Sequence, residues 1–203
     1  MGADLRAALI EALDSANQVQ ATRSKAPRHG EKLQDLYDPE FQVKVARTLA
    51  RLKDPRTIPV LAGALGTGGV VTDALADFGE RAVPDVRRVV VSPESDTWLV
   101  NDGLEALRFM VEAGNISAKA RKEIRSAAKM RLLSNKQNVT TLWWAIDLGA
   151  ALNDPELKQI IRSPASDRKA IVARGLIDPY EIDKTQRRAL DRLAGVAAFP
   201  RKR

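Results

Sequence analysis

Trp143 and Asp147 have the residue types and the spacing that could do chemistry on a sugar or a nucleobase. They are four positions apart, so on a helix they would share one face, one turn from each other. An indole ring can stack on a base, and a carboxylate beside it could stabilise a developing oxocarbenium cation. The simpler interpretation is that a tryptophan packs between helices and that Asp147 is a surface charge. We favour this simpler interpretation.

Other kinds of catalytic site lack their residues. The chain has no cysteine and one histidine, His29, which lies in a polar stretch. A metal site built on clustered histidines or cysteines is therefore not expected. A Ser-His-Asp or Cys-His nucleophile would depend on His29 alone or on an absent thiol. We expect no cofactor, and an enzyme is the less favoured class of protein.

Positive charge is concentrated in the second part of the chain. Residues 1–118 carry a net charge of −3, and residues 119–203 carry a net charge of +10. Such an asymmetry indicates an anionic partner. The densest cluster lies on a helix expected to begin after Ser117, where helical spacing places several cations on one face. The members of this basic stripe are Arg121, Lys122, Arg125 and Lys129.

The basic stripe has no acidic residue of its own. Glu123 is the only acid between Ala118 and Lys136, so we expect uncompensated repulsion among the cations of this helix. An anionic partner would relieve that repulsion. The sequence therefore predicts that the stripe binds an acidic surface, either of a protein or of a phosphate backbone. The alternative is a solvated helix face, as on any amphipathic helix.

Short helices are the elements expected to position these groups. The apolar residues are mostly Ala, Leu and Val, and aromatic residues make up only 4% of the chain, which favours packed helices over a sheet. Asp-Pro pairs recur where helices would begin, because Asp is a good N-cap and Pro suits the first helical position. These pairs are Asp38–Pro39, Asp54–Pro55, Asp154–Pro155 and Asp178–Pro179.

Apolar spacing predicts which helix faces are buried. A first helix is expected over about residues 3–20, with a buried row from Leu5 to Ala16, and residues 22–30 are expected to form a polar loop. A second helix would bury Phe41, Val45, Leu49 and Leu52. A last helix would start at a capping box of Asp183 and Gln186 and bury Leu190, Leu193, Ala194 and Ala197.

Residues 54–84 contain an internal repeat. Ile58, Leu61, Ala62 and Leu65 have the spacing of one helix face, and glycines at positions 66, 68 and 69 then interrupt the helix. On a second helix Val71, Ala74, Leu75 and Phe78 repeat this spacing and are expected to be buried, and Gly79 follows where a C′ glycine is expected. Residues 82–86 align with residues 57–61, an offset of 25 positions. A helix pair that repeats at a short period is typical of a solenoid.

The repeat resembles the HEAT repeat, especially the short bacterial form of phycobilin-lyase-type proteins. That form has an Asp-x-Arg step, an apolar-Pro-x-Leu step and a second helix with an Ala-Leu pair that ends in Gly. The matching residues are Asp54, Arg56, Ile58, Pro59, Leu61, Ala74, Leu75 and Gly79. The resemblance implies an all-α fold, a short right-handed α-solenoid of about four to five helix pairs, and does not specify a function.

We therefore expect one solenoid domain over residues 1–203. It would comprise an N-terminal helix and polar loop (1–30), HEAT-like repeats (38–113), basic C-terminal helices (117–198) and a basic tail (199–203). No signal peptide or membrane span is visible, which predicts a cytoplasmic location, or export if a leader has been removed.

Two functions are compatible with these features. The first is a non-catalytic scaffold or adaptor that binds a protein partner, possibly an acidic one. The second is nucleic-acid binding by the basic half of the chain. The more specific form of this second function is enzymatic. The segment with Trp143, Trp144 and Asp147 resembles the HEAT-like alkylation-repair DNA glycosylases, which implies release of alkylated bases.

Overall fold

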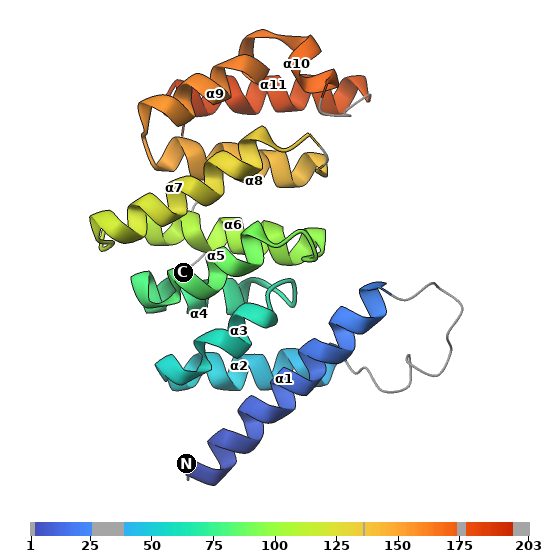
Figure 1. The fold of residues 1–203 in the computed structure, drawn as a ribbon, viewed down its shortest axis with the longest axis vertical. Coiled ribbons are helices and arrows are strands. Elements are labelled where there is room, and N and C mark those ends of the chain that lie inside the picture. Colours follow the sequence, from blue (N-terminus) through green and yellow to red (C-terminus); the bar gives the residue numbers. More distant parts are fainter. Residues whose placement is uncertain (1–2, 26–38, 136, 174–177, 197–203) are drawn as a thin grey trace. The chain divides into compact units, whose positions relative to one another are not determined.

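The computed structural model describes residues 3–25, 39–135, 137–173 and 178–196, and these residues contain helices and no strands. This confirms the all-α prediction (Figure 1). The chain divides into two compact units, Met1–Ala106 and Leu107–Arg203, and the division falls inside α6 (Thr97–Glu112). A single solenoid domain therefore stays a prediction.

The helices of unit 1 pack on helices close to them in the chain. Helix α1 packs on α2 and α3, α2 packs on α4, and α3 packs on both α4 and α5. Leu49, Leu61, Leu65 and Leu75 are fully buried between them. The elements of unit 1 before α6 are α1 (Ala3–Lys25), α2 (Pro39–Leu52), the 3₁₀ helix η2 (Pro55–Thr57), α3 (Ile58–Gly63), α4 (Gly69–Phe78), the 3₁₀ helix η3 (Gly79–Ala82) and α5 (Val83–Val91).

The offset of 25 residues seen in the sequence is also a structural repeat. A 3₁₀ turn leads into α3, and a second one leads into α5, with Pro59 and Pro84 in the first turn of the two helices. The residues that flank these prolines, Ile58 and Leu61 in α3 and Val83 and Val86 in α5, are buried. The predicted buried face of α3 is therefore confirmed.

The predicted glycine turn joins α3 to α4. Gly66 and Gly68 have φ values of +91° and +125°, which favour glycine. The Gly66 N–H donates a hydrogen bond of 2.9 Å to the Asp102 carboxylate in α6, which holds the turn in place. Burial raises the pKa of Asp102, and this hydrogen bond opposes the rise.

In unit 2 the helices also pack on helices close to them in the chain, and α11 packs on both α8 and α9. Helix α7 packs on α8, α8 packs on α9 and α11, and α10 packs on α9 and α11. As predicted, Ser117 caps α7, its hydroxyl accepting a hydrogen bond from the Ala120 N–H. The helices after α6 are α7 (Ala118–Leu133), α8 (Val139–Ala151), α9 (Pro155–Ser166), α10 (Arg168–Val172) and α11 (Pro179–Leu193).

The Asp-Pro helix starts are confirmed wherever the structure describes them. The carboxylates of Asp54, Asp154 and Asp178 each accept a backbone N–H of the helix that follows, whereas Asp38 lies outside the described residues. Lys53 and Asn153 precede two of these caps and have φ values of +49° and +54°. These two corners therefore share one backbone conformation.

The predicted buried face of α1 is wrong in part. Leu13 is buried, but Leu5 is 52% exposed. Polar side chains of α1 also make contacts: Arg6 forms an ion pair with Asp54, and Asn17 donates a hydrogen bond to the Val60 carbonyl. The helix also continues to Lys25, so residues 22–25 are not a loop. The rest of that expected loop, with His29, lies outside the described residues.

Two other predicted faces also differ from the structure. In α2, Phe41 is 46% exposed and the neighbouring Gln42 is fully buried. Helix α11 begins after Asp178, so the expected capping box of Asp183 lies inside the helix. Leu190 of α11 is exposed, and the buried residues are Ile182, Thr185 and Ala189. Ala197 lies outside the described residues.

Among the residues that the structure describes, no helix combines the length and the apolar character that crossing a membrane requires.

Candidate functional site: a cation-lined hollow beside helix α7

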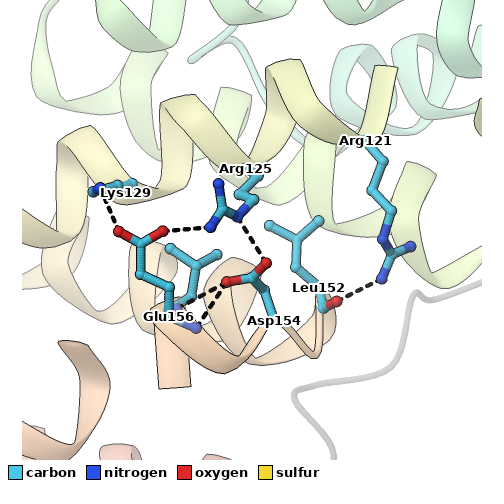
Figure 2. Close-up of polar contacts among 7 residues, drawn as sticks. Arg121, Arg125, Lys129, Leu152, Asp154 and Glu156 are labelled. Carbon is cyan, nitrogen blue, oxygen red and sulfur yellow. Dashed lines mark hydrogen bonds and ion pairs between the residues drawn. The ribbon is translucent and has the colours of Figure 1, made fainter. Parts of the chain in front are cut away.

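The basic stripe lies where α7 meets the start of α9 (Figure 2). Arg125 Nε donates to Asp154 Oδ2 at 2.7 Å, and the same guanidinium forms an ion pair with Glu156. Lys129 forms a second ion pair with Glu156. Arg121 donates a hydrogen bond to the Leu152 carbonyl, at the end of α8. Three of the four cations are therefore bound within unit 2.

The expected uncompensated repulsion along α7 is thus wrong. The compensating acids belong to the Asp154-Pro155-Glu156 start of α9, 29 and 27 residues away from the cations that they bind. The sequence indicates only a helix start at Asp154, and Glu156 lies in the first turn of that helix. Nothing in the local pattern of α7 indicates where these acids lie in the fold.

Asp154 performs two tasks at this corner. Its Oδ1 atom accepts hydrogen bonds from the Glu156 and Leu157 N–H groups at 3.0 and 3.1 Å, while Oδ2 accepts from Arg125. Desolvation acts to raise the pKa of Asp154, but the Leu157 N–H and Arg125 together hold this pKa below its ordinary value. The hydrogen bond from Lys129 lowers the pKa of Glu156. Both groups are therefore carboxylates at neutral pH.

A small hollow opens beside the stripe, with a volume of about 210 Å³. Three cations and one acid line it, so its charge is positive even after Asp154 has neutralised one cation. Lys122 is exposed, and its ammonium group has no hydrogen-bond or ion-pair partner in the part of unit 2 that the structure describes. The lining residues are Ala118, Arg121, Lys122, Arg125, Leu152 and Asp154.

The position of these cations on α7 adds to the positive potential. The first turn of α7 contains no acid, and Lys119, Arg121 and Lys122 all lie near its N-terminus. A helix N-terminus carries a partial positive charge, so cations there are unfavourable and an anion is favoured. A bound anion would interact favourably with both the helix end and the lining side chains.

Asp147 is not a surface charge, which corrects the simpler interpretation of this residue. Its side chain is 0% exposed and forms ion pairs with Arg188 and Arg192 of α11. Oδ1 accepts from Arg188 Nε at 3.0 Å and from Arg192 Nε at 2.7 Å, and Oδ2 accepts from the other end of Arg188. Both oxygens are occupied, so the carboxylate does not face a substrate.

Trp143 packs between α8 and α11, as the simpler interpretation predicted. Its Nε1–H donates a hydrogen bond of 2.7 Å to the Thr185 hydroxyl. The Lys184 ammonium lies 4.3 Å from the centroid of the Trp143 ring, and the Arg188 guanidinium lies at 5.8 Å. Cations of the protein itself therefore lie against the indole that a substrate base would need.

The partners of Asp147 and Trp143 were not identified in the sequence. Arg188 and Arg192 are four positions apart on α11, and Thr185 lies three positions before Arg188, so these side chains share a helix face. This spacing could have indicated the shared face, but the apolar periodicity of the same helix predicted a buried Leu190.

Among the described residues, no group of three or more His, Cys, Asp or Glu side chains could hold a metal ion.

The ion pairs at the start of α9 predict an acid-sensitive stability. Asp154 and Glu156 have pKa values below their ordinary values of 3.8 and 4.5. Their stabilisation is therefore complete above about pH 5 and is lost as the pH falls through the lowered pKa values. We expect Glu156→Gln to reduce the drop in melting temperature between pH 6 and pH 3. Glu11→Gln, an exposed acid of α1, should leave that drop unchanged, and an equal change in both variants would contradict the assignment.

No family model, curated protein or solved structure matches this chain in comparisons with known proteins. The resemblance to HEAT repeats therefore stays a prediction that rests on the residues of the repeat itself.

Proposed function

We propose that this protein is a non-catalytic adaptor, a short HEAT-like helical scaffold that binds an acidic partner protein in the hollow beside α7. The observation that carries the proposal is the charge of this hollow, whose lining includes three cations, Arg121, Lys122 and Arg125, and one acid, Asp154. A carboxylate side chain of the partner would bind between Lys122 and the two arginines.

Two features of the fold support the scaffold. The 3₁₀ turn followed by a proline-containing helix occurs twice, at η2–α3 and η3–α5. Helices of both units pack on helices that are close in the chain, as they do in a right-handed solenoid of helix pairs. Proteins of this architecture present extended surfaces to partners, which suits an adaptor.

The hollow can hold one carboxylate side chain of a partner protein, since its volume is about 210 Å³. The nucleic-acid alternative depends on the net charge of residues 119–203 and, in its glycosylase form, on Asp147 and Trp143. Since Asp147 is buried between two arginines and Lys184 lies over Trp143, the geometry argues against the glycosylase form.

Lys122→Gln tests the proposal with little disturbance of the fold, because Lys122 is exposed and its ammonium group forms no hydrogen bond or ion pair in the described part of unit 2. We expect the variant to weaken binding of a fluorescent polyglutamate peptide about two- to fivefold, as the loss of one exposed charge pair predicts. Fluorescence anisotropy at low and at physiological salt measures this change. Arg125→Gln and Lys129→Gln would be poorer tests, since both also break ion pairs with α9.

Arg187→Gln is the matched control, because it removes an exposed cation of α11 outside the hollow. An equal loss of peptide binding in Lys122→Gln and Arg187→Gln would show that only the net charge matters, and the hollow would not be the site. Duplex DNA provides the second probe. Binding of DNA that is tighter than binding of the peptide at physiological salt, and that falls steeply with salt, would favour the nucleic-acid alternative.

A further inference from the structure

Unit 1 contains a larger groove, of about 540 Å³, which has no part in the site beside α7. It lies between the C-terminal end of α2, the start of η2 and one face of α4, and its volume is in the range of ligand-binding clefts. The lining residues are Ala50, Arg51, Lys53, Pro55, Val70, Asp73, Ala74, Asp77, Phe78 and Arg81.

Helix α4 carries two apolar rows, and only one of them belongs to the core. Val71 and Leu75 are 2% and 0% exposed and pack inside unit 1. Val70, Ala74 and Phe78 lie at i, i+4 and i+8 and line the groove instead, with Val70 42% exposed. Ala74 and Phe78 were expected in the core stripe, so this second row corrects that prediction. An apolar row at helical spacing is a surface on which another helix can pack.

Charged residues flank the apolar row of Val70, Ala74 and Phe78, with cations from α2, the turn after it and η3, and acids from α4. Arg51 and Lys53 come from the end of α2 and the turn after it, and Arg81 comes from η3. All three are exposed, and their side chains form no hydrogen bond or ion pair with the residues that the structure describes. Asp73 and Asp77 lie on α4 itself, one turn apart. The groove is therefore apolar along its length, basic on the side of α2 and η3, and acidic on α4.

We infer that this groove binds an amphipathic helix of a partner protein that carries acidic residues beside its apolar row. The apolar side chains pack on Val70, Ala74 and Phe78, and the acidic side chains pair with Arg51, Lys53 and Arg81. This surface is independent of the hollow beside α7, and either one can bind without the other.

Three synthetic peptides of equal length test the inference by fluorescence anisotropy. The first has a helical pattern of Leu with Glu, the second replaces Glu by Lys, and the third replaces Leu by Ser. We expect the Leu–Glu peptide to bind most tightly. Val70→Ser should weaken its binding about three- to tenfold through lost apolar burial, and Arg81→Gln should weaken it about two- to fivefold. Because Val70 and Arg81 are exposed, both variants should keep the far-UV circular dichroism and melting temperature of the wild type.

Val172→Ser is the matched control, since Val172 is 44% exposed on α10 of unit 2. It should leave peptide binding unchanged. Equal binding of the Leu–Glu and Leu–Lys peptides, no binding of any peptide, or no effect of Val70→Ser would each overturn the inference. Binding that is lost in Lys122→Gln but kept in Val70→Ser would also overturn it, while supporting the function proposed for the hollow beside α7.

Discussion

Replacing Asp147 by alanine is expected to lower the free energy of unfolding of unit 2 by about 3–5 kcal/mol, the usual cost of breaking a buried ion pair. The Asp147 side chain is completely buried, and the side chains of Arg188 and Arg192 are only 14% and 9% exposed. The variant would leave two guanidinium groups in this site without their carboxylate. Urea denaturation followed by circular dichroism measures the loss.

Asp183→Ala provides the comparison for this loss. Asp183 pairs with Arg168 on the surface, where both side chains are more than half exposed, and such a pair contributes at most about 1 kcal/mol. If the two variants lose the same stability, the cluster around Asp147 does not hold α8 to α11.

Asp147→Asn is a separate test, of catalysis. We expect no release of base from DNA with N-alkylated purines, and release by the wild type that the variant loses would overturn the non-catalytic proposal.

Leu61→Ala is expected to destabilise unit 1 by about 2–5 kcal/mol, because it removes methyl groups from a filled core and leaves a cavity. Leu61 is 0% exposed in α3, the helix that packs on α1, α4 and α5. Leu5→Ala is the control, since Leu5 of α1 is already 52% exposed and should change stability little. Equal losses in urea denaturation would show that α3 does not form the centre of this unit.

Helix starts could be predicted because few residues, all close in the chain, determine them. Ser117 and Asp154 bond to N–H groups within three positions, so the signal is local. The buried faces of α1, α2 and α11 were harder to predict. Those helices bury polar side chains whose partners come from other elements, such as Gln42 with Asn17 and Trp143 with Thr185. Apolar periodicity contains no information about such pairs.

The candidate site shows the same limit for charge. In α7, Lys122 and Arg125 line the same hollow, Arg125 and Lys129 both pair with the start of α9, and Ile124 is buried. Which of these cations are already neutralised depends on how α9 packs against α7. Only the fold brings Glu156 to Lys129, and only the fold shows that Lys122 is the cation of this row without a partner among the described residues.

Two of the described Asp-Pro helix starts, one in each unit, also bear on how the units open. Asp54 caps η2 and binds Arg6 of α1, and Asp154 caps α9 and binds Arg125 of α7. One carboxylate thus both begins a helix and ties an earlier helix to it. We therefore expect fraying at the start of α9 to be coupled to release of α7, so that hydrogen exchange would show the amides of these two segments opening as one cooperative unit.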